Sequence, residues 1–191
     1  MPGTLRVLLI RHAEPVPPGD PRFEENDRPL SDRGRVQAME LASGLGGMDI
    51  AAVYSSPYPR AVQTVQPLAD ARRLTVTTVP DLRERLLSPQ PLPDWREHLE
   101  AAWRDHDYCL PGAESGRAAQ ARAMAALEEI AARHPQGGTV ALGSHGNLIA
   151  LVLHAAEPGV DYAFWSQIPM PALYVLERSD AGWRVLSGPG L

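Results

Sequence analysis

Short apolar runs alternate with segments of helical spacing along most of the chain. A strand buried on both faces is apolar at nearly every position. This character predicts strands over residues 5–10, 50–54, 74–79 and 139–143. Apolar residues at helical spacing predict helices between these strands, over about 31–45, 58–70, 115–133 and 147–155. Near the C-terminus, two further runs flank Ser179-Asp180-Ala181-Gly182, over 173–178 and 183–186, which is typical of an antiparallel hairpin.

Strands that alternate with helices indicate a mainly parallel sheet with helices on both faces. We therefore expect a three-layer α/β/α sandwich, and the closing hairpin predicts an antiparallel edge. A chain of 191 residues fits a single domain that spans residues 1–191. Four prolines in Pro15–Pro21 exclude a helix or an inner strand there, and Pro89, Pro91 and Pro93 mark a second loop.

Several details of the helices follow from particular residues. Ser31 is placed to cap a helix N-terminus, and an apolar series at helical spacing follows it, namely Val36, Met39, Ala42 and Leu45. Pro67 is expected to kink or shorten its helix, because proline lacks a backbone N–H. An amphipathic helix is predicted from the spacing of Trp95, Leu99 and Trp103. We expect Trp95, Trp103 and Met124 to be core residues.

Composition excludes several classes of protein. The net charge is −5, which argues against a general nucleic-acid-binding protein. Cys109 is the only cysteine, so no internal disulfide can form. No apolar run approaches the roughly 18 residues of a membrane span, and the N-terminus lacks the features of a signal peptide. We therefore expect a cytoplasmic protein without a membrane partner. All 18 basic residues are arginine, so an anion site would use Arg, His, backbone N–H groups or a metal.

Polar residues follow four of the predicted strands and carry the candidate chemistry. Arg11 and His12 follow the first, and Arg60, Glu84 and His145 come after the next three. In open α/β sheets, ligands bind outside the carboxyl ends of the strands. Guanidinium forks match phosphate oxygens, a neutral imidazole can attack phosphorus, and helix N-termini can add N–H groups. A second imidazole, if protonated, would stabilise charge on the phosphoryl oxygens. The pattern predicts a site for a phosphoryl group.

Six segments resemble the histidine phosphatase superfamily, which includes phosphoglycerate mutases and small phosphatases. The family's opening Arg-His-Gly-Glu is similar to Arg11-His12-Ala13-Glu14. The other five follow in family order and are Arg28-Pro29-Leu30-Ser31 with Gly34 and Gln37-Ala38, Ser55-Ser56-Pro57 with Arg60-Ala61 and Gln63-Thr64, Leu82-Arg83-Glu84, Gly112-Ala113-Glu114-Ser115, and Ser144-His145-Gly146. One such segment would be weak evidence, whereas the ordered set is specific.

The resemblance implies a phosphomonoester hydrolase that needs neither metal nor cofactor and acts on a small phosphorylated substrate. His12 would be the phosphorylated nucleophile, and Glu84 the general acid and base. Arg11, Arg60 and His145 would complete the phosphate pocket. Ala13 replaces the usual glycine, and Pro15–Pro21 replaces a more polar stretch in which mutases carry a phosphate-binding asparagine.

Alternatives remain open at this stage. A phosphoglycerate-type mutase would share the site, and a non-catalytic phospholigand-binding module would need neither nucleophile nor acid. Glu14 and Glu114 compete with Glu84 for the role of acid. His12, Glu14 and His145 could be drawn as a metal site, but the nearby arginines would repel a cation. The loops over 15–29 and 85–94 are expected to select the leaving group, and neither substrate nor oligomeric state can be predicted.

Overall fold

A six-stranded mixed sheet forms the centre of the molecule in the computed structural model, which describes residues 3–191. The strands are β1 (Leu5–Arg11), β2 (Ala52–Ser55), β3 (Val76–Thr78), β4 (Gly138–Ser144), β5 (Ala172–Ser179) and β6 (Gly182–Ser187). Their order is β3-β2-β4-β1-β5-β6. The four strands from β3 to β1 pair in parallel, and β5 and β6 add antiparallel pairs at the other edge. The expected sheet, with its antiparallel edge, is confirmed.

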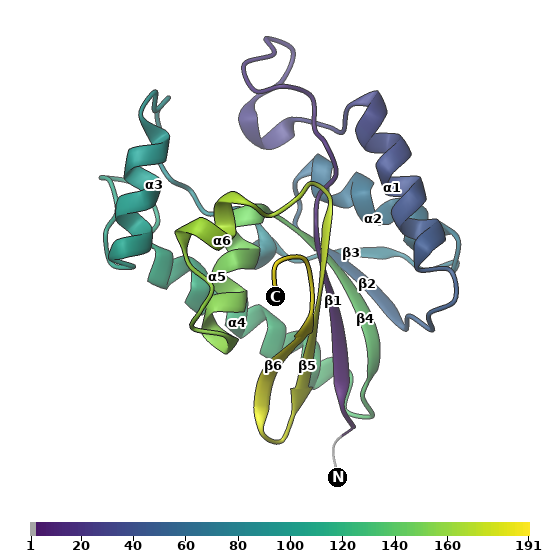
Figure 1. Ribbon diagram of the computed structural model, residues 1–191. Helices are drawn as coiled ribbons and strands as arrows, with labels where there is room; N and C mark the ends of the chain where they lie inside the picture. The colour runs from purple at the N-terminus through teal and green to yellow at the C-terminus, as the bar shows by residue number, and fades with distance from the viewer. Residues whose placement is uncertain (1–2) are drawn as a thin grey trace.

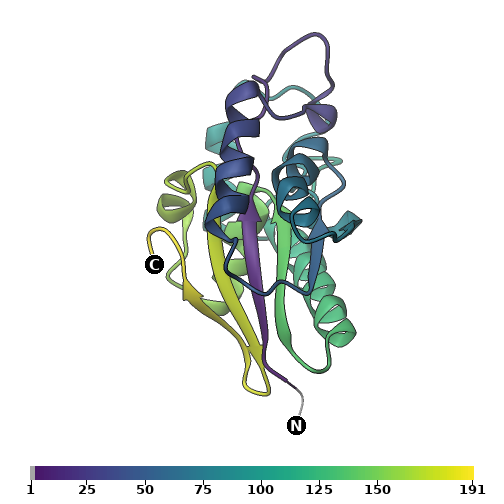
Figure 2. The ribbon, with the colours of Figure 1, turned by 90° about the vertical axis from the view of Figure 1, so that its right-hand side faces the viewer.

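Helices cover both faces of this sheet. They are α1 (Asp32–Gly44), α2 (Pro59–Asp70), α3 (Trp95–Arg104), α4 (Gly116–Arg133), α5 (Gly146–Ala156) and α6 (Tyr162–Ser166), with short 3-10 helices η1 (Glu25–Asp27) and η2 (Pro80–Leu82). Figure 1 shows α1 and α2 on one side of the sheet and α4, α5 and α6 on the other. Figure 2 shows α1 and α2 side by side over the face they cover. The three-layer α/β/α architecture is therefore also confirmed.

Alternation along β1 divides the core into two layers. Val7 and Leu9 pack in the cluster formed with α4 and α5, whereas Leu8 and Ile10 pack in the cluster formed with α1 and α2. All four side chains are buried. Successive strand residues point to opposite faces, so only a strand covered on both faces reads as a continuous apolar run. Because β1, β2, β3 and β4 run parallel, their carboxyl ends share one edge of the sheet, at the top of Figure 1.

The buried face of α1 agrees only in part with the one that hydrophobic spacing predicts, because Ala42 and Leu45 are buried but the other two members of the series are not. Val36 and Met39 are 48% and 56% exposed, and the buried positions of α1 are the small residues Gly34, Ala38 and Ala42. Close approach explains the choice, because a Cβ on Gly34 would lie 2.0 Å from the carbonyl oxygen of Glu14. The predicted N-cap is confirmed, since the Ser31 hydroxyl accepts the N–H of Gly34 at 3.0 Å.

Two other expectations need correction, and one helix was missed. Pro67 does not shorten α2, which continues to Asp70, because the proline lies in the last turn of the helix. Trp95 is 38% exposed and does not lie in the core. Trp103 and Met124, in contrast, pack against the core cluster as expected. Helix α6 was not expected, because five residues are too few for a helical period to show in the sequence.

Candidate active site

His12 lies immediately beyond β1 and is 7% exposed. Its peptide N–H donates to the carbonyl of Ser144 at 3.0 Å, which holds the residue against the end of β4. The ring Nδ1 lies 2.8 Å from the carbonyl oxygen of Ala13. A carbonyl can only accept, so Nδ1 carries the proton and the lone pair of Nε2 is available.

The charge state of His12 agrees with this arrangement. Burial is the largest cause that lowers its pKa to about 3, and the positive charges of Arg60, Arg11 and Arg28 act in the same direction. The hydrogen bond to Ala13 opposes them. The imidazole is therefore neutral at physiological pH, as a nitrogen nucleophile must be.

The second histidine, His145, is fully buried at the N-cap of α5, with its ring centroid 5.2 Å from that of His12. Burial is the largest cause that lowers the pKa of His145 well below its usual range, and the positive charges of Arg60, Arg122 and Arg11 act in the same direction. This shift favours the neutral imidazole of His145, whereas the expectation of a protonated imidazole concerns the charge on bound phosphoryl oxygens. The Ser56 hydroxyl lies 2.8 Å from Nε2 and accepts the N–H of Tyr58 at 3.2 Å. Its own proton has no other acceptor among residues 3–191, and a bond from this hydroxyl to Nε2 leaves the imidazole N–H on Nδ1.

Two guanidinium groups flank the histidines. Arg11 donates to the carbonyl oxygens of Ile168 and Pro169, and its guanidinium packs so close to Gly146 that a Cβ there would lie 3.0 Å away. Arg60, in the first turn of α2, is 4% exposed and donates through Nη1 to the carbonyl of Glu25 at 2.8 Å. Burial lowers the pKa values of Arg11 and Arg60 below the ordinary value of a guanidinium group. The negative charge of Glu84 opposes this lowering in both residues.

Three buried nitrogens around His12 lack a hydrogen-bond partner within residues 3–191. They are Nε of Arg11, Nε of Arg60 and Nδ1 of His145. A buried donor without a partner costs about 1–3 kcal/mol, so such groups are rarely left unpaired in folded proteins. Their chemistry fits the oxygens of a phosphoryl group, because all three can donate and two of them are cationic.

Glu84 follows η2 and places its carboxylate at the N-terminus of α5. Its oxygens accept the backbone N–H groups of Asn147 at 3.1 Å and Leu148 at 3.0 Å, and that of Arg85 at 2.9 Å. The N-terminus of α5 was expected to offer its N–H groups to the phosphate. The structure corrects this for Asn147 and Leu148, whose N–H groups bind Glu84 instead.

A second layer of contacts fixes the segment that carries Glu84. Arg122 of α4 donates to the carbonyls of Asp81 at 2.6 Å and Arg83 at 3.0 Å. The Ser144 hydroxyl donates to the carbonyl of Leu82 at 2.9 Å, which connects the segment to the end of β4. The position of the Glu84 carboxylate is thus set by both α4 and β4.

The competing carboxylates are engaged elsewhere. Glu14 accepts the Ser31 hydroxyl at 2.8 Å and pairs with Arg33 at 3.5 Å. Burial would raise the pKa of Glu114, but its hydrogen bonds to Arg122 and the charge of Arg122 outweigh burial and lower it. Glu114 is therefore held ionised by an arginine, which is unsuitable for a proton donor.

Sequence reasoning missed Arg28 and Glu25 as site residues. Arg28 is 9% exposed, and its charge lowers the pKa of both His12 and Arg60. Glu25 accepts two hydrogen bonds from Arg28 and lies 3.8 Å from Arg60. Arg28 did stand in a recognised segment, directly before Pro29-Leu30-Ser31, but Glu25 lies in a loop without periodicity.

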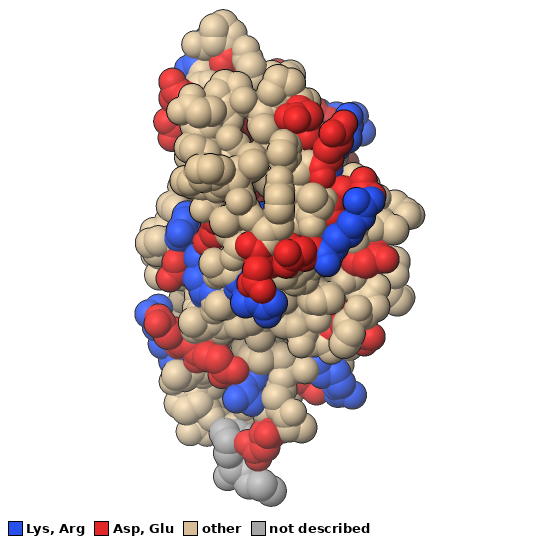
Figure 3. All heavy atoms as spheres, turned by 90° about the vertical axis from the view of Figure 1, so that its left-hand side faces the viewer, with Lys and Arg blue, Asp and Glu red and all other residues tan. Residues whose placement is uncertain are grey.

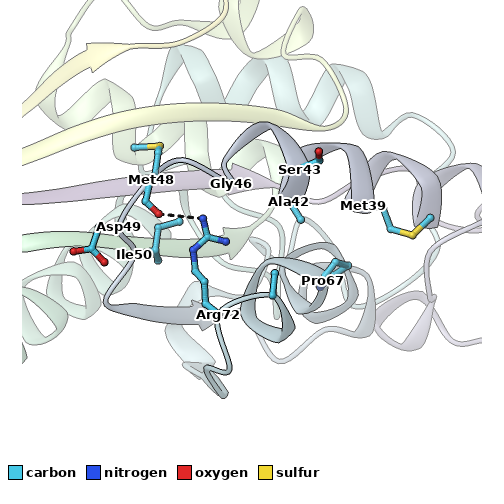
Figure 4. Close-up of a pocket in the computed structure, with 10 residues that line it drawn as sticks. Met39, Ala42, Ser43, Gly46, Met48, Asp49, Ile50, Pro67 and Arg72 are labelled. Atoms are coloured by element: carbon cyan, nitrogen blue, oxygen red, sulfur yellow. Dashed lines mark hydrogen bonds between the residues drawn. The ribbon is translucent and has the colours of Figure 1, made fainter.

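Among the residues that the structure describes, two other features bear comparison with this site. A groove of about 680 Å³ lies between the C-terminal parts of α1 and α2, away from the strand ends (Figure 4). Its arginine, Arg72, donates to the carbonyls of Leu45 and Met48. Within residues 3–191, no group of three or more His, Cys, Asp or Glu is arranged to hold a metal ion. None of the helices there has the length and apolar character needed to cross a membrane.

Comparison with known proteins agrees with this geometry. The model of the histidine phosphatase superfamily, branch 1, matches residues 7–188. A glucosyl-3-phosphoglycerate phosphatase of Mycobacterium tuberculosis is 30% identical over 203 residues, which cover 96% of this chain and 85% of the relative. Two further relatives are also 30% identical. A probable phosphoglycerate mutase of Yersinia enterocolitica aligns over 78% of this chain and 73% of its own length, and phosphoserine phosphatase 1 of Hydrogenobacter thermophilus over 85% and 81%.

The fold has the same relatives. A solved structure of a mycobacterial glucosyl-3-phosphoglycerate phosphatase superposes with a TM-score of 0.77 at 26% identity, over 95% of this chain and 97% of that one. Fold and site together define a phosphomonoester hydrolase that acts through a phosphohistidine and needs no metal. The chain belongs to the histidine phosphatase superfamily, branch 1.

Proposed function

We propose that the chain is one histidine-phosphatase domain in which His12 is the nucleophile and Glu84 the general acid and base. Nε2 of His12 attacks phosphorus in line, and the bond between phosphorus and the leaving oxygen breaks. Glu84 gives its proton to that oxygen. Water then attacks the phosphohistidine, Glu84 takes up the proton of the water, and inorganic phosphate leaves as the N–P bond breaks.

The observation that supports these roles most strongly is the set of unpaired buried nitrogens around a neutral imidazole. Nε of Arg11, Nε of Arg60 and Nδ1 of His145 can donate to the three non-bridging phosphoryl oxygens. Groups that are already positioned for the charge of the transition state need no reorganisation during the reaction. His12 meanwhile keeps Nε2 unprotonated through its bond to Ala13.

The expected partners follow from charge and composition. A small phosphorylated metabolite is the proposed substrate, as it is for the named phosphatases among the relatives. Figure 3 shows acidic and basic side chains next to one another on the face that carries α3, instead of the continuous basic surface that nucleic acid requires. With one cysteine and a net charge of −5, we propose a cytoplasmic protein.

Hydrolysis is distinguished from the mutase reaction by the fate of the phosphoryl group. We expect incubation with 3-phosphoglycerate or 2-phosphoglycerate to release inorganic phosphate without interconversion, even after priming with 2,3-bisphosphoglycerate. Both products are measured in one chromatographic assay. If isomerisation is faster than phosphate release, the mutase is favoured. If the natural protein releases phosphate from every phosphomonoester no faster than the His12→Ala variant does, the binding module is favoured.

A further inference from the structure

Glu25 places an exposed carboxylate on two buried guanidinium groups at the mouth of the site. Its oxygens accept from Nε of Arg28 at 2.8 Å and from Nη2 of Arg28 at 2.5 Å, which is a paired, planar contact. Nη2 of Arg60 lies 3.8 Å from the same carboxylate. The Glu25 side chain is 61% exposed, whereas those of Arg28 and Arg60 are 10% and 4% exposed.

The two arginines do not depend on this carboxylate for their positions. Arg28 also donates through Nη1 to the carbonyl of Val16 at 2.7 Å, and the N–H of Val16 donates to Pro29 at 2.9 Å. Arg60 is held through Nη1 by the backbone carbonyl of Glu25, which belongs to the loop and not to the side chain. The carboxylate is therefore the part of this contact that can leave while the guanidinium groups stay in place.

The location of Arg28 connects this contact to the reaction. Arg28 and Arg60 share the Glu25 carboxylate, which lies 2.8 Å from Nε of Arg28 and 3.8 Å from Nη2 of Arg60, so an anion bound to the fork of Arg28 lies beside Arg60 of the proposed phosphate pocket. The positive charge of Arg28 also lowers the pKa of His12. Burying two guanidinium groups next to one phosphoryl pocket is expensive unless anions neutralise them. Glu25 neutralises them, and because its own side chain is 61% exposed, water screens this contact and can solvate the carboxylate when another anion replaces it.

We propose that the fork of Arg28 is a subsite for a carboxylate of the substrate, and that Glu25 occupies this subsite until substrate binds. The proposal rests on the phosphatase function proposed above and narrows its substrate class. The substrate is a phosphomonoester that carries a carboxylate a few bonds from the phosphate. A carboxylate is favoured over a second phosphate because the paired contact with Glu25 is already that of a carboxylate.

Matched substrate pairs isolate the contribution of the carboxylate. 3-Phosphoglycerate differs from glycerol 3-phosphate only in a carboxylate instead of a hydroxymethyl group, and O-phosphoserine differs from O-phosphoethanolamine only by its carboxylate. The measured quantity is the ratio of kcat/KM for the carboxylate member to kcat/KM for its partner. We expect this ratio to exceed about ten in both pairs for the natural sequence, as a charge-assisted contact implies.

Two variants are expected to move the ratio in opposite directions. Glu25→Gln removes the competing charge and should raise the ratio about three- to fivefold, the range of an exposed ion pair. Arg28→Lys keeps the charge but loses the fork, and should lower the ratio about tenfold. Asp27→Asn is the matched control, since Asp27 lies on the same 3-10 helix and its side chain has no hydrogen bond or ion pair within residues 3–191. Its ratio should be unchanged.

The opposite results are equally specific. If Glu25→Gln lowers KM equally for both members of each pair, Glu25 competes with the phosphoryl group itself and the subsite does not exist. If neither variant changes the ratio while both keep the melting temperature of the natural sequence, Glu25 only braces the loop. Failure of the phosphatase function is recognised separately, because neither member of any pair would then be hydrolysed in a manner that depends on His12.

Discussion

Replacing Arg60 with lysine is expected to lower kcat/KM about a hundred- to a thousandfold, because one positioned donor to the transition state contributes about 2.7–4 kcal/mol. Arg60 is 4% exposed, its Nε has no partner among the described residues, and its guanidinium lies 5.0 Å from the centre of the Tyr58 ring. Lysine keeps the charge but provides neither the planar donors nor the stacking surface. Steady-state rates with a phosphomonoester measure the effect.

Arg35→Lys is the control for this change. Arg35 lies on α1 with a side chain that is 57% exposed and pairs with Asp32 at 3.2 Å, so we expect its activity to stay within about twofold. Melting temperatures should be compared for both variants, since a folding defect would lower activity without informing on the site. Near-normal turnover in a well-folded Arg60→Lys protein would remove Arg60 from contact with the phosphoryl group.

Glu84→Gln should have a large effect that depends on the leaving group. Proton transfer contributes about 10²–10⁴-fold when the leaving oxygen is a poor one, so an alkyl phosphate should be slowed by that amount. p-Nitrophenyl phosphate should lose much less, because nitrophenolate departs without a proton. Single-turnover rates are needed, since slow hydrolysis of the phosphohistidine would hide the difference.

The structure identifies a second consequence of this substitution. Glu84 accepts N–H groups from Asn147 and Leu148, and the amide nitrogen of glutamine cannot accept in its place. That local disturbance is the same for every substrate, so only the difference between leaving groups reports proton transfer. Glu14→Gln provides the control and should keep the leaving-group dependence of the natural sequence. Equal slowing of both substrates by Glu84→Gln would show that Glu84 is not the acid.

Much of the fold could be predicted because its signals are local. Buried strands can be recognised from continuous apolar runs such as Leu5 to Ile10. Since β1 and β4 are parallel neighbours, the residues that follow them, His12 and His145, lie at the same edge of the sheet. Helix α1 shows where this reasoning fails. Close backbone approach at Gly34 places the first turn of this helix, which hydrophobic spacing does not reveal. Val36 and Met39 face solvent, whereas Ala42 and Leu45 are buried as the spacing predicts.

The site could be predicted as a set of residues but not as a set of charge states. The structure brings together Arg11, His12, Arg60, Glu84 and His145, as the strand ends suggested. His145 is completely buried, and this burial opposes protonation of its ring. Burial of this kind depends on tertiary packing, so the sequence around His145 does not predict it. The pairing of Glu25 with Arg28 likewise depends on how a proline-rich loop folds back over α2.

Trapping the covalent intermediate tests the central claim most directly. The protein is mixed with a ³²P-labelled phosphomonoester, quenched in base within milliseconds, and the labelled peptide is sequenced. We expect an acid-labile, base-stable phosphate on His12, formed and lost at rates that account for turnover, with no label retained in His12→Ala. Label on Ser55 or Ser56 instead, or full activity in His12→Ala, would contradict the account.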